Sequence, residues 1–102
     1  MTYYQVFISA ENKEQASKIL DSLLEKKLVL GGSILEGPAK FWWKGEIVEM
    51  GYCYILTYTK EQYKDAVITD VRQTTAEEVP MISFIEFEGN AELIKLIDET
   101  LK

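Results

Sequence analysis

The sequence predicts one α+β domain in which strands and helices follow the order β-α-β-β-α-β, with a further helix at the end. Three observations support this. Four runs are rich in β-branched and aromatic residues, two segments between them carry apolar residues at helical spacing, and Lys44-Gly45 separates two of the runs. A length of 102 residues is typical of a single domain, which we expect to span residues 1–102.

The first strand and helix are predicted from the N-terminal third of the chain. Residues 3–9 combine aromatic and β-branched side chains, which favours a strand. Asn12, followed three residues later by Gln15, is typical of a helix cap. The helix should end near Lys26 and Lys27, whose charges suit the C-terminal end of the helix dipole. Its predicted apolar face consists of Ala16, Ile19, Leu20, Leu23 and Leu24.

A long hairpin is predicted in the middle of the chain. Residues 28–43 and 46–58 form its strands, and Lys44 and Gly45 form its turn, because glycine readily adopts the positive φ that a tight turn needs. The glycines at 31 and 32 indicate a bulge or a close backbone approach. Pro38 cannot donate a hydrogen bond to a neighbouring strand, so its strand is expected at a sheet edge.

The second half repeats the pattern of helix and strand. Residues 59–62 match a capping box and predict a helix start, residues 72–78 predict a polar connection, and residues 81–87 predict a strand. Asn90 is expected to cap the last helix. The two helices have apolar stripes of Tyr63, Ala66, Val67 and Val71, and of Leu93, Ile94, Ile97 and Leu101. This order of elements is the ferredoxin-like sandwich.

Composition excludes several classes of function. A net charge of −6 argues against a nucleic-acid partner and against adhesion to anionic membranes. The absence of histidine removes Ser–His and Cys–His nucleophile pairs and the commonest transition-metal ligand, while carboxylate sites for hard cations stay open. We see no membrane span or signal peptide, and the single Cys53 cannot form an internal disulfide, so we expect a cytoplasmic protein.

The two tryptophans point to self-assembly. Trp42 and Trp43 lie beside the turn of a hairpin whose indoles and backbone edges need a covering surface, and a second subunit can supply one. They face opposite ways on a regular strand. We expect Trp42 to be exposed or to contact another subunit, whereas Trp43 either packs in the protein or lines a cleft.

Tyrosines and glutamates supply the other candidate site residues. Tyr52, Tyr54 and Tyr58 share one strand face and form either an aromatic ladder or a pocket wall, with Cys53 buried on the other side. Carboxylates surround the last strand and are either solvated charges or ligands of a divalent cation; no other cofactor is expected. These carboxylates are Glu77, Glu78, Glu86 and Glu88.

The chain resembles the CutA divalent-cation tolerance family almost from end to end. The resemblance is carried by LEKKLVLGGSI at residues 24–34, by EVP at 78–80, and by single positions between and after them. These positions are Gly37, Trp43, Gly45, Ile47, Gly89 and Asn90. The resemblance implies a non-enzymatic homotrimer related to PII proteins, whose hairpin crosses to the neighbouring subunit, and which binds a small ligand or metal ion in clefts between subunits.

Our candidates for that cleft are Trp43, Tyr52, Tyr58 and Glu78, with Glu77, Glu86 and Glu88 as candidate metal ligands. The chain departs from the family pattern at several of the matching positions, which makes it a diverged member. Gly31 stands where the family usually has cysteine, Tyr52 where it has glutamate, and Tyr58 where it has lysine. Among residues 75–81, only Glu78 and Pro80 match.

Two other functions remain open on the sequence. The first is a small ferredoxin-like enzyme that uses Tyr and Glu in acid–base chemistry. The second is a purely structural trimer. Fold class does not separate these from a ligand-binding protein.

Overall fold

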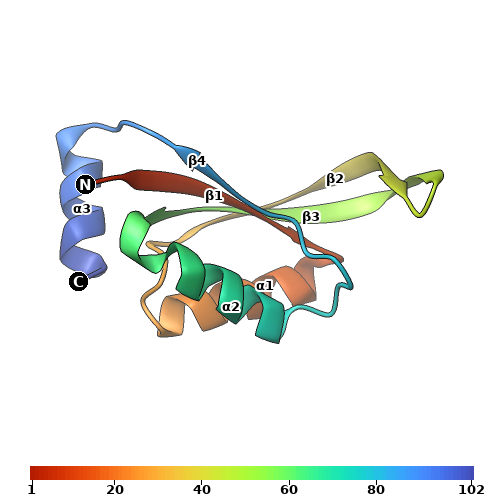
Figure 1. The fold of residues 1–102 in the computed structure, drawn as a ribbon, viewed down its shortest axis with the longest axis horizontal. Coiled ribbons are helices and arrows are strands. Elements are labelled where there is room, and N and C mark those ends of the chain that lie inside the picture. The colour runs from red at the N-terminus through yellow and green to blue at the C-terminus, as the bar shows by residue number, and fades with distance from the viewer.

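The computed structural model describes residues 1–102 and contains one four-stranded antiparallel sheet with the strand order β2-β3-β1-β4 (Figure 1). This is the order of a ferredoxin-like sandwich, so the predicted fold class is confirmed. The elements are β1 (Tyr3–Ala10), α1 (Lys13–Glu25), β2 (Gly32–Trp43), β3 (Glu46–Lys60), η1 (Glu61–Tyr63), α2 (Lys64–Thr74), β4 (Ile82–Glu86) and α3 (Ala91–Thr100).

The hydrophobic core lies between the sheet and the pair α1 and α2, which cover one of its faces (Figure 1). Alternate residues of β1 and β3 point into it, as the strand period requires. Cys53 is among them, as predicted. The α3 helix stands at one end of the sheet, where Tyr3 and Lys60 both reach Asp98. The core includes the fully buried side chains of Ile8, Ile19, Leu23, Ile55, Val67 and Val71.

The β2-β3 hairpin projects beyond the rest of the sheet as an arm (Figure 1). The last pair between β1 and β3 is Ala10 with Cys53, whereas β2 and β3 stay paired as far as Trp43 with Glu46. Lys44 and Gly45 have φ values of 48° and 83°, and two positive φ values in a two-residue turn are those of type I′. The predicted turn is therefore confirmed.

Predictions at the other glycine, proline and asparagine positions have mixed outcomes. Gly32 does lie at a close backbone approach, because an added Cβ there would be 1.9 Å from the Leu56 carbonyl oxygen. Pro38 lies on an edge strand, as expected. Asn12 caps α1 by accepting a hydrogen bond of 2.8 Å from the Gln15 N–H. Asn90 is at the N-cap position of α3, as predicted, but its side chain makes no capping hydrogen bond, and its amide donates to Glu92.

The predicted capping box at residues 59–62 is wrong. Thr59 is still in β3, and its hydroxyl donates a hydrogen bond of 2.7 Å to the Leu28 carbonyl. A 3₁₀ turn follows, and α2 then continues to Thr74, through residues predicted as a polar connection. The predicted strand 28–43 likewise begins only at Gly32. None of the helices has the length and hydropathy needed to cross a bilayer.

Candidate functional site

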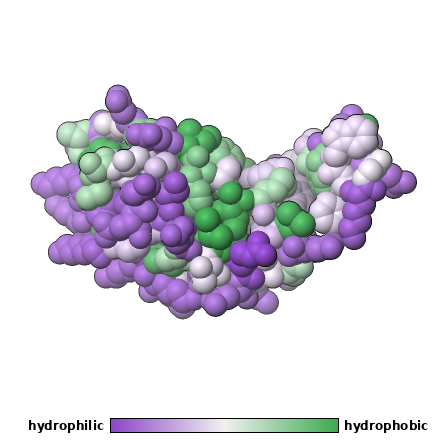
Figure 2. All heavy atoms as spheres, viewed as in Figure 1, coloured by the Kyte–Doolittle hydropathy of each residue, from purple (hydrophilic) through white to green (hydrophobic).

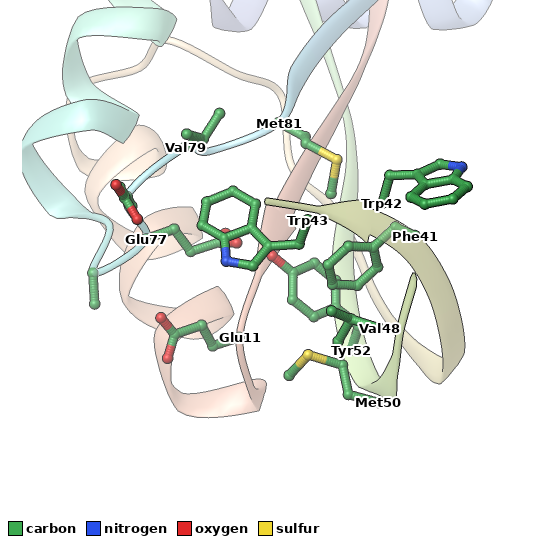
Figure 3. Close-up of a pocket in the computed structure, with 12 residues that line it drawn as sticks. Glu11, Phe41, Trp42, Trp43, Val48, Met50, Tyr52, Glu77, Val79 and Met81 are labelled. Atoms are coloured by element: carbon green, nitrogen blue, oxygen red, sulfur yellow. The ribbon is translucent and has the colours of Figure 1, made fainter. Parts of the chain in front are cut away.

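A pocket with a volume of about 610 Å³ lies at the base of the arm. One wall is the hairpin, and the other consists of Glu11, just after β1, and the loop that leads from α2 into β4 (Figure 3). This one chain supplies residues to both walls. It is lined by Phe41, Trp42, Trp43, Val48, Met50, Tyr52, Ala76, Val79, Met81, Glu11, Glu77 and Glu78.

The hairpin wall is aromatic. The Trp43 indole lies on the side of Glu11 and Glu77, whereas the Trp42 indole points away from them (Figure 3). Their exposures agree with this, at 37% for Trp43 and 72% for Trp42. Behind Trp43, the Tyr52 ring is 6% exposed and packs against Phe41 at 5.6 Å between ring centroids. The predicted opposite orientation of the two indoles is confirmed.

The loop wall is fixed to the end of β1 through Ser9, which is fully buried. The Ser9 N–H donates to the Met81 carbonyl, and the Met81 N–H donates to the Ser9 hydroxyl oxygen, both at 2.9 Å. The Ser9 hydroxyl donates in turn to Glu77 Oε1 at 2.8 Å. Gln15 on α1 holds the start of the same loop by bonding the Thr74 carbonyl and the Ala76 N–H. The carboxylate of Glu77 is therefore held in place by buried structure.

The charged side chains that line the pocket are all acidic. Desolvation by burial raises the pKa of Glu77, the hydrogen bond from Ser9 lowers it, and the nearby Glu11 carboxylate raises it again. Glu78 differs, because Lys44 Nζ lies 3.3 Å from its Oε2. The same ammonium lies 5.3 Å from the centroid of the Trp43 ring. Neither Glu11 nor Glu77 belongs to an ion pair.

The structure brings some of the sequence-predicted site residues together. Trp43, Tyr52 and Glu78 line the pocket, and so does Glu77, which the sequence suggested only as a metal ligand. Tyr58 lies elsewhere on β3, against Phe87 at 5.3 Å between ring centroids.

Glu86 and Glu88 also lie away from the pocket. Glu86 pairs with Tyr4, and about 17 Å of strand separates Tyr4 from Ser9, the residue that bonds Glu77. Glu88 lies just beyond the end of β4. The three predicted metal ligands thus do not form one site.

Sequence reasoning missed eight lining residues, which are Glu11, Phe41, Trp42, Val48, Met50, Ala76, Val79 and Met81. Glu11 gave the clearest available signal, because it lies two residues after the predicted strand 3–9 and immediately before the predicted helix cap Asn12. The contact between the end of β1 and the loop before β4 could not be predicted from the sequence, because it depends on the hydrogen bonds of Ser9.

The residues present do not fit a resident metal ion. No group of three or more Cys, Asp and Glu side chains is placed to hold one, and the chain has no histidine. Cys53 lies in the core, and burial together with the Glu36 charge raises the pKa of its thiol, which opposes formation of the thiolate that a soft metal requires.

Comparison with known proteins identifies the family. The model of the family "CutA1 divalent ion tolerance protein" matches residues 4–100. The divalent-cation tolerance protein CutA of Archaeoglobus fulgidus is 31% identical over 98 residues, which cover 95% of this chain and 96% of that protein. The Thermotoga maritima CutA is 30% identical over 84 residues, covering 82% of this chain and 83% of that protein.

Solved structures agree across the whole fold. The A. fulgidus CutA structure, described as periplasmic, has a TM-score of 0.93 at 29% identity and covers 98% of this chain and 99% of its own. The CutA1 structure from Oryza sativa has the same TM-score of 0.93 at 19% identity, covering 100% of this chain and 95% of its own, which shows likeness of fold alone. The extent of these matches along the chain places this protein in the CutA1 divalent ion tolerance family.

Proposed function

We propose that this protein is a non-enzymatic, cytoplasmic homotrimer that binds a small ligand in the pocket at the base of its arm. Its contribution to divalent-ion tolerance would be indirect, through ligand sensing rather than through chelation of the metal. The observation that carries the proposal is the pocket itself. It combines an aromatic wall on a protruding hairpin with a loop whose carboxylate is held by buried hydrogen bonds.

Self-assembly is supported by the sheet face opposite α1 and α2. The register places Phe7 beside Leu56 and Leu35 beside Tyr54 on that face. Leu35 and Ile85 are 48% and 51% exposed, and Figure 2 shows hydrophobic side chains gathered between the body and the arm. An exposed apolar surface of this kind marks an interaction site in a soluble protein.

The two edges of the sheet are also compatible with a ring of copies. Strands β2 and β4 are the two edges, and they differ in length and sequence. If β2 of one copy contacts β4 of the next, the interface is head-to-tail, and such interfaces form rings when the rotation closes. The family resemblance supports three as the number of copies, with the arm reaching the neighbouring subunit.

The test is native mass spectrometry of protein purified without added metal, first under gentle and then under denaturing conditions. We expect a trimer carrying extra mass that is lost on denaturation and that identifies the ligand. A clean trimer that also binds nothing in the titrations described below would favour a structural module. A dimer or monomer would refute the trimer. It would favour the alternative function, a small ferredoxin-like enzyme that uses Tyr and Glu in acid–base chemistry.

The indirect role in ion tolerance needs its own experiment. Cells that lack their own protein of this family would be complemented with this chain or with a Trp43→Ala variant and challenged with copper or zinc salts. We expect the unaltered chain to restore growth and the variant to fail, while both remain trimers. If the variant restores growth equally well, ion tolerance does not depend on the pocket.

A further inference from the structure

The charge of the pocket restricts which ligand it can hold. Its nine apolar side chains supply contact area, and its three charged side chains, Glu11, Glu77 and Glu78, are all carboxylates. No lysine or arginine lines it. A ligand carrying carboxylate or phosphate would meet only like charge in a partly dehydrated space, which costs free energy.

The chain already shows how a cation fits this wall. The Lys44 ammonium lies 5.3 Å from the centroid of the Trp43 ring and 3.3 Å from Glu78 Oε2. An ammonium between an indole face and a carboxylate is stabilised by both the ring quadrupole and the opposite charge. Lys44 itself lies at the turn of the arm beside Glu78 and is not one of the residues that line the pocket.

The part of the pocket beside Glu11 and Glu77 also combines carboxylates with an indole, but no lysine or arginine lies between them. Glu11 and Glu77 both line this part of the pocket (Figure 3), and neither has a lysine or arginine partner. Ser9 bonds Glu77 Oε1, and no protein group donates to Glu77 Oε2. The Trp43 indole lies on this side of the hairpin (Figure 3).

We infer that the pocket binds an organic cation, in which a primary ammonium is joined to an aromatic or similarly apolar body. The ammonium lies between Glu11 and Glu77, and the apolar body lies against Trp43, Phe41 and Met81. A bare metal ion fits less well, because no three ligating side chains converge here and most of the lining is apolar. This inference rests on the proposed function, since it names the ligand class of the same pocket.

The test compares three probes of nearly equal shape on the unaltered full-length chain by isothermal titration calorimetry, at low salt and pH 8. The probes are phenethylamine, 2-phenylethanol and 3-phenylpropionate, which are cationic, neutral and anionic. We expect phenethylamine to bind at least about tenfold more tightly than the alcohol, because its ammonium makes charge-assisted contacts, and we expect no measurable binding of the acid.

Two matched variants localise the effect. In Glu11→Gln/Glu77→Gln, the preference for phenethylamine over 2-phenylethanol should disappear while alcohol binding persists. In Asp21→Asn/Glu25→Gln, which removes two charges from the exposed surface of α1, the preference should be unchanged. The single Glu11→Gln variant, at an exposed position, serves if the double variant is poorly folded, and it should lose part of the preference.

The inference is overturned if the alcohol or the acid binds as tightly as the amine, if none of the three binds, or if both double variants weaken the amine equally. Displacement of bound amine by millimolar Mg²⁺ or Ca²⁺ with tighter binding of the metal would also overturn it. The oligomeric state is measured on the same samples. A trimer without selectivity thus refutes the ligand class alone, whereas selectivity in a monomer refutes the proposed assembly alone.

Discussion

Lys44 Nζ lies 3.3 Å from Glu78 Oε2, so the turn of the arm is tied to the loop that precedes β4. Both side chains are about two-thirds exposed, and an ion pair in that setting contributes little to stability. Its effect is on position, because it joins the two walls of the pocket across the opening. The pair also places the ammonium against Trp43, which ties the indole to the same contact.

Replacing Lys44 should therefore loosen the pocket more than it destabilises the fold. For Lys44→Gln we expect a loss of less than about 1 kcal/mol in unfolding free energy, with a clear increase in acrylamide quenching of tryptophan fluorescence. The matched control is Lys40→Gln, which breaks a 3.0 Å pair with Glu49 inside the hairpin. Equal quenching in the two variants would show that the arm is not held by Glu78.

A buried carboxylate makes the contact between α1 and α2 sensitive to one lysine. The Asp70 side chain is 4% exposed, is paired with Lys26, and leaves its Oδ2 without a hydrogen-bond partner. Lys26→Met removes the compensating charge and should cost about 2 kcal/mol in urea unfolding. Lys13→Met breaks only the exposed pair with Glu36 and should cost much less. Similar losses in both would argue against burial as the cause.

The first residue of β2 must be glycine for steric reasons. A Cβ at Gly32 would lie 1.9 Å from the Leu56 carbonyl oxygen, whereas a Cβ at Gly37 meets nothing within 4 Å. We expect Gly32→Ala to lower the unfolding free energy by about 3 kcal/mol or more and Gly37→Ala to change it by less than about 0.5 kcal/mol. Chemical denaturation of the two variants decides the matter. A small change in unfolding free energy for Gly32→Ala would mean that β2 can shift away from β3 without destabilising the fold.

The raised pKa of Glu77 gives stability a defined dependence on pH. Because the folded state binds the Glu77 proton more readily than the unfolded state, stability should fall as pH rises from the ordinary value of 4.5 through the raised pKa. Glu77→Gln keeps an acceptor for Ser9 and removes this dependence. We compare the urea midpoints of the two proteins at each pH. The midpoint of the variant minus that of the unaltered chain should increase from pH 4.5 to pH 7.

Glu11→Gln provides the companion measurement. It removes the neighbouring charge that raises the pKa of Glu77, so the pH dependence of the midpoint should become shallower without vanishing, since desolvation remains the larger cause. An unchanged pH profile in both variants would show that Glu77 titrates as an exposed carboxylate.

The sequence by itself determined the features that depend on neighbouring residues. The order of elements, the Lys44-Gly45 turn, the Asn12 cap and the opposite orientations of Trp42 and Trp43 all follow from local conformational preference and from strand and helix periods. Predictions from local patterns were wrong where a residue distant in the sequence provided a competing hydrogen-bond partner. Thr59 reads as a helix cap, but its hydroxyl bonds the Leu28 carbonyl while its backbone stays in the sheet.

Only the tertiary structure decided the composition of the pocket. Glu11 and Glu77 line one pocket because buried Ser9 fastens the end of β1 to the loop before β4. Trp43 lines it too, because the arm extends past the last β1–β3 pair. Tyr58 has the same strand parity as Tyr52 and still lies outside, since parity fixes the face of a strand and not the position along it. The physical reason is that the pocket is made by long-range pairing and hydrogen bonding, which no local pattern encodes.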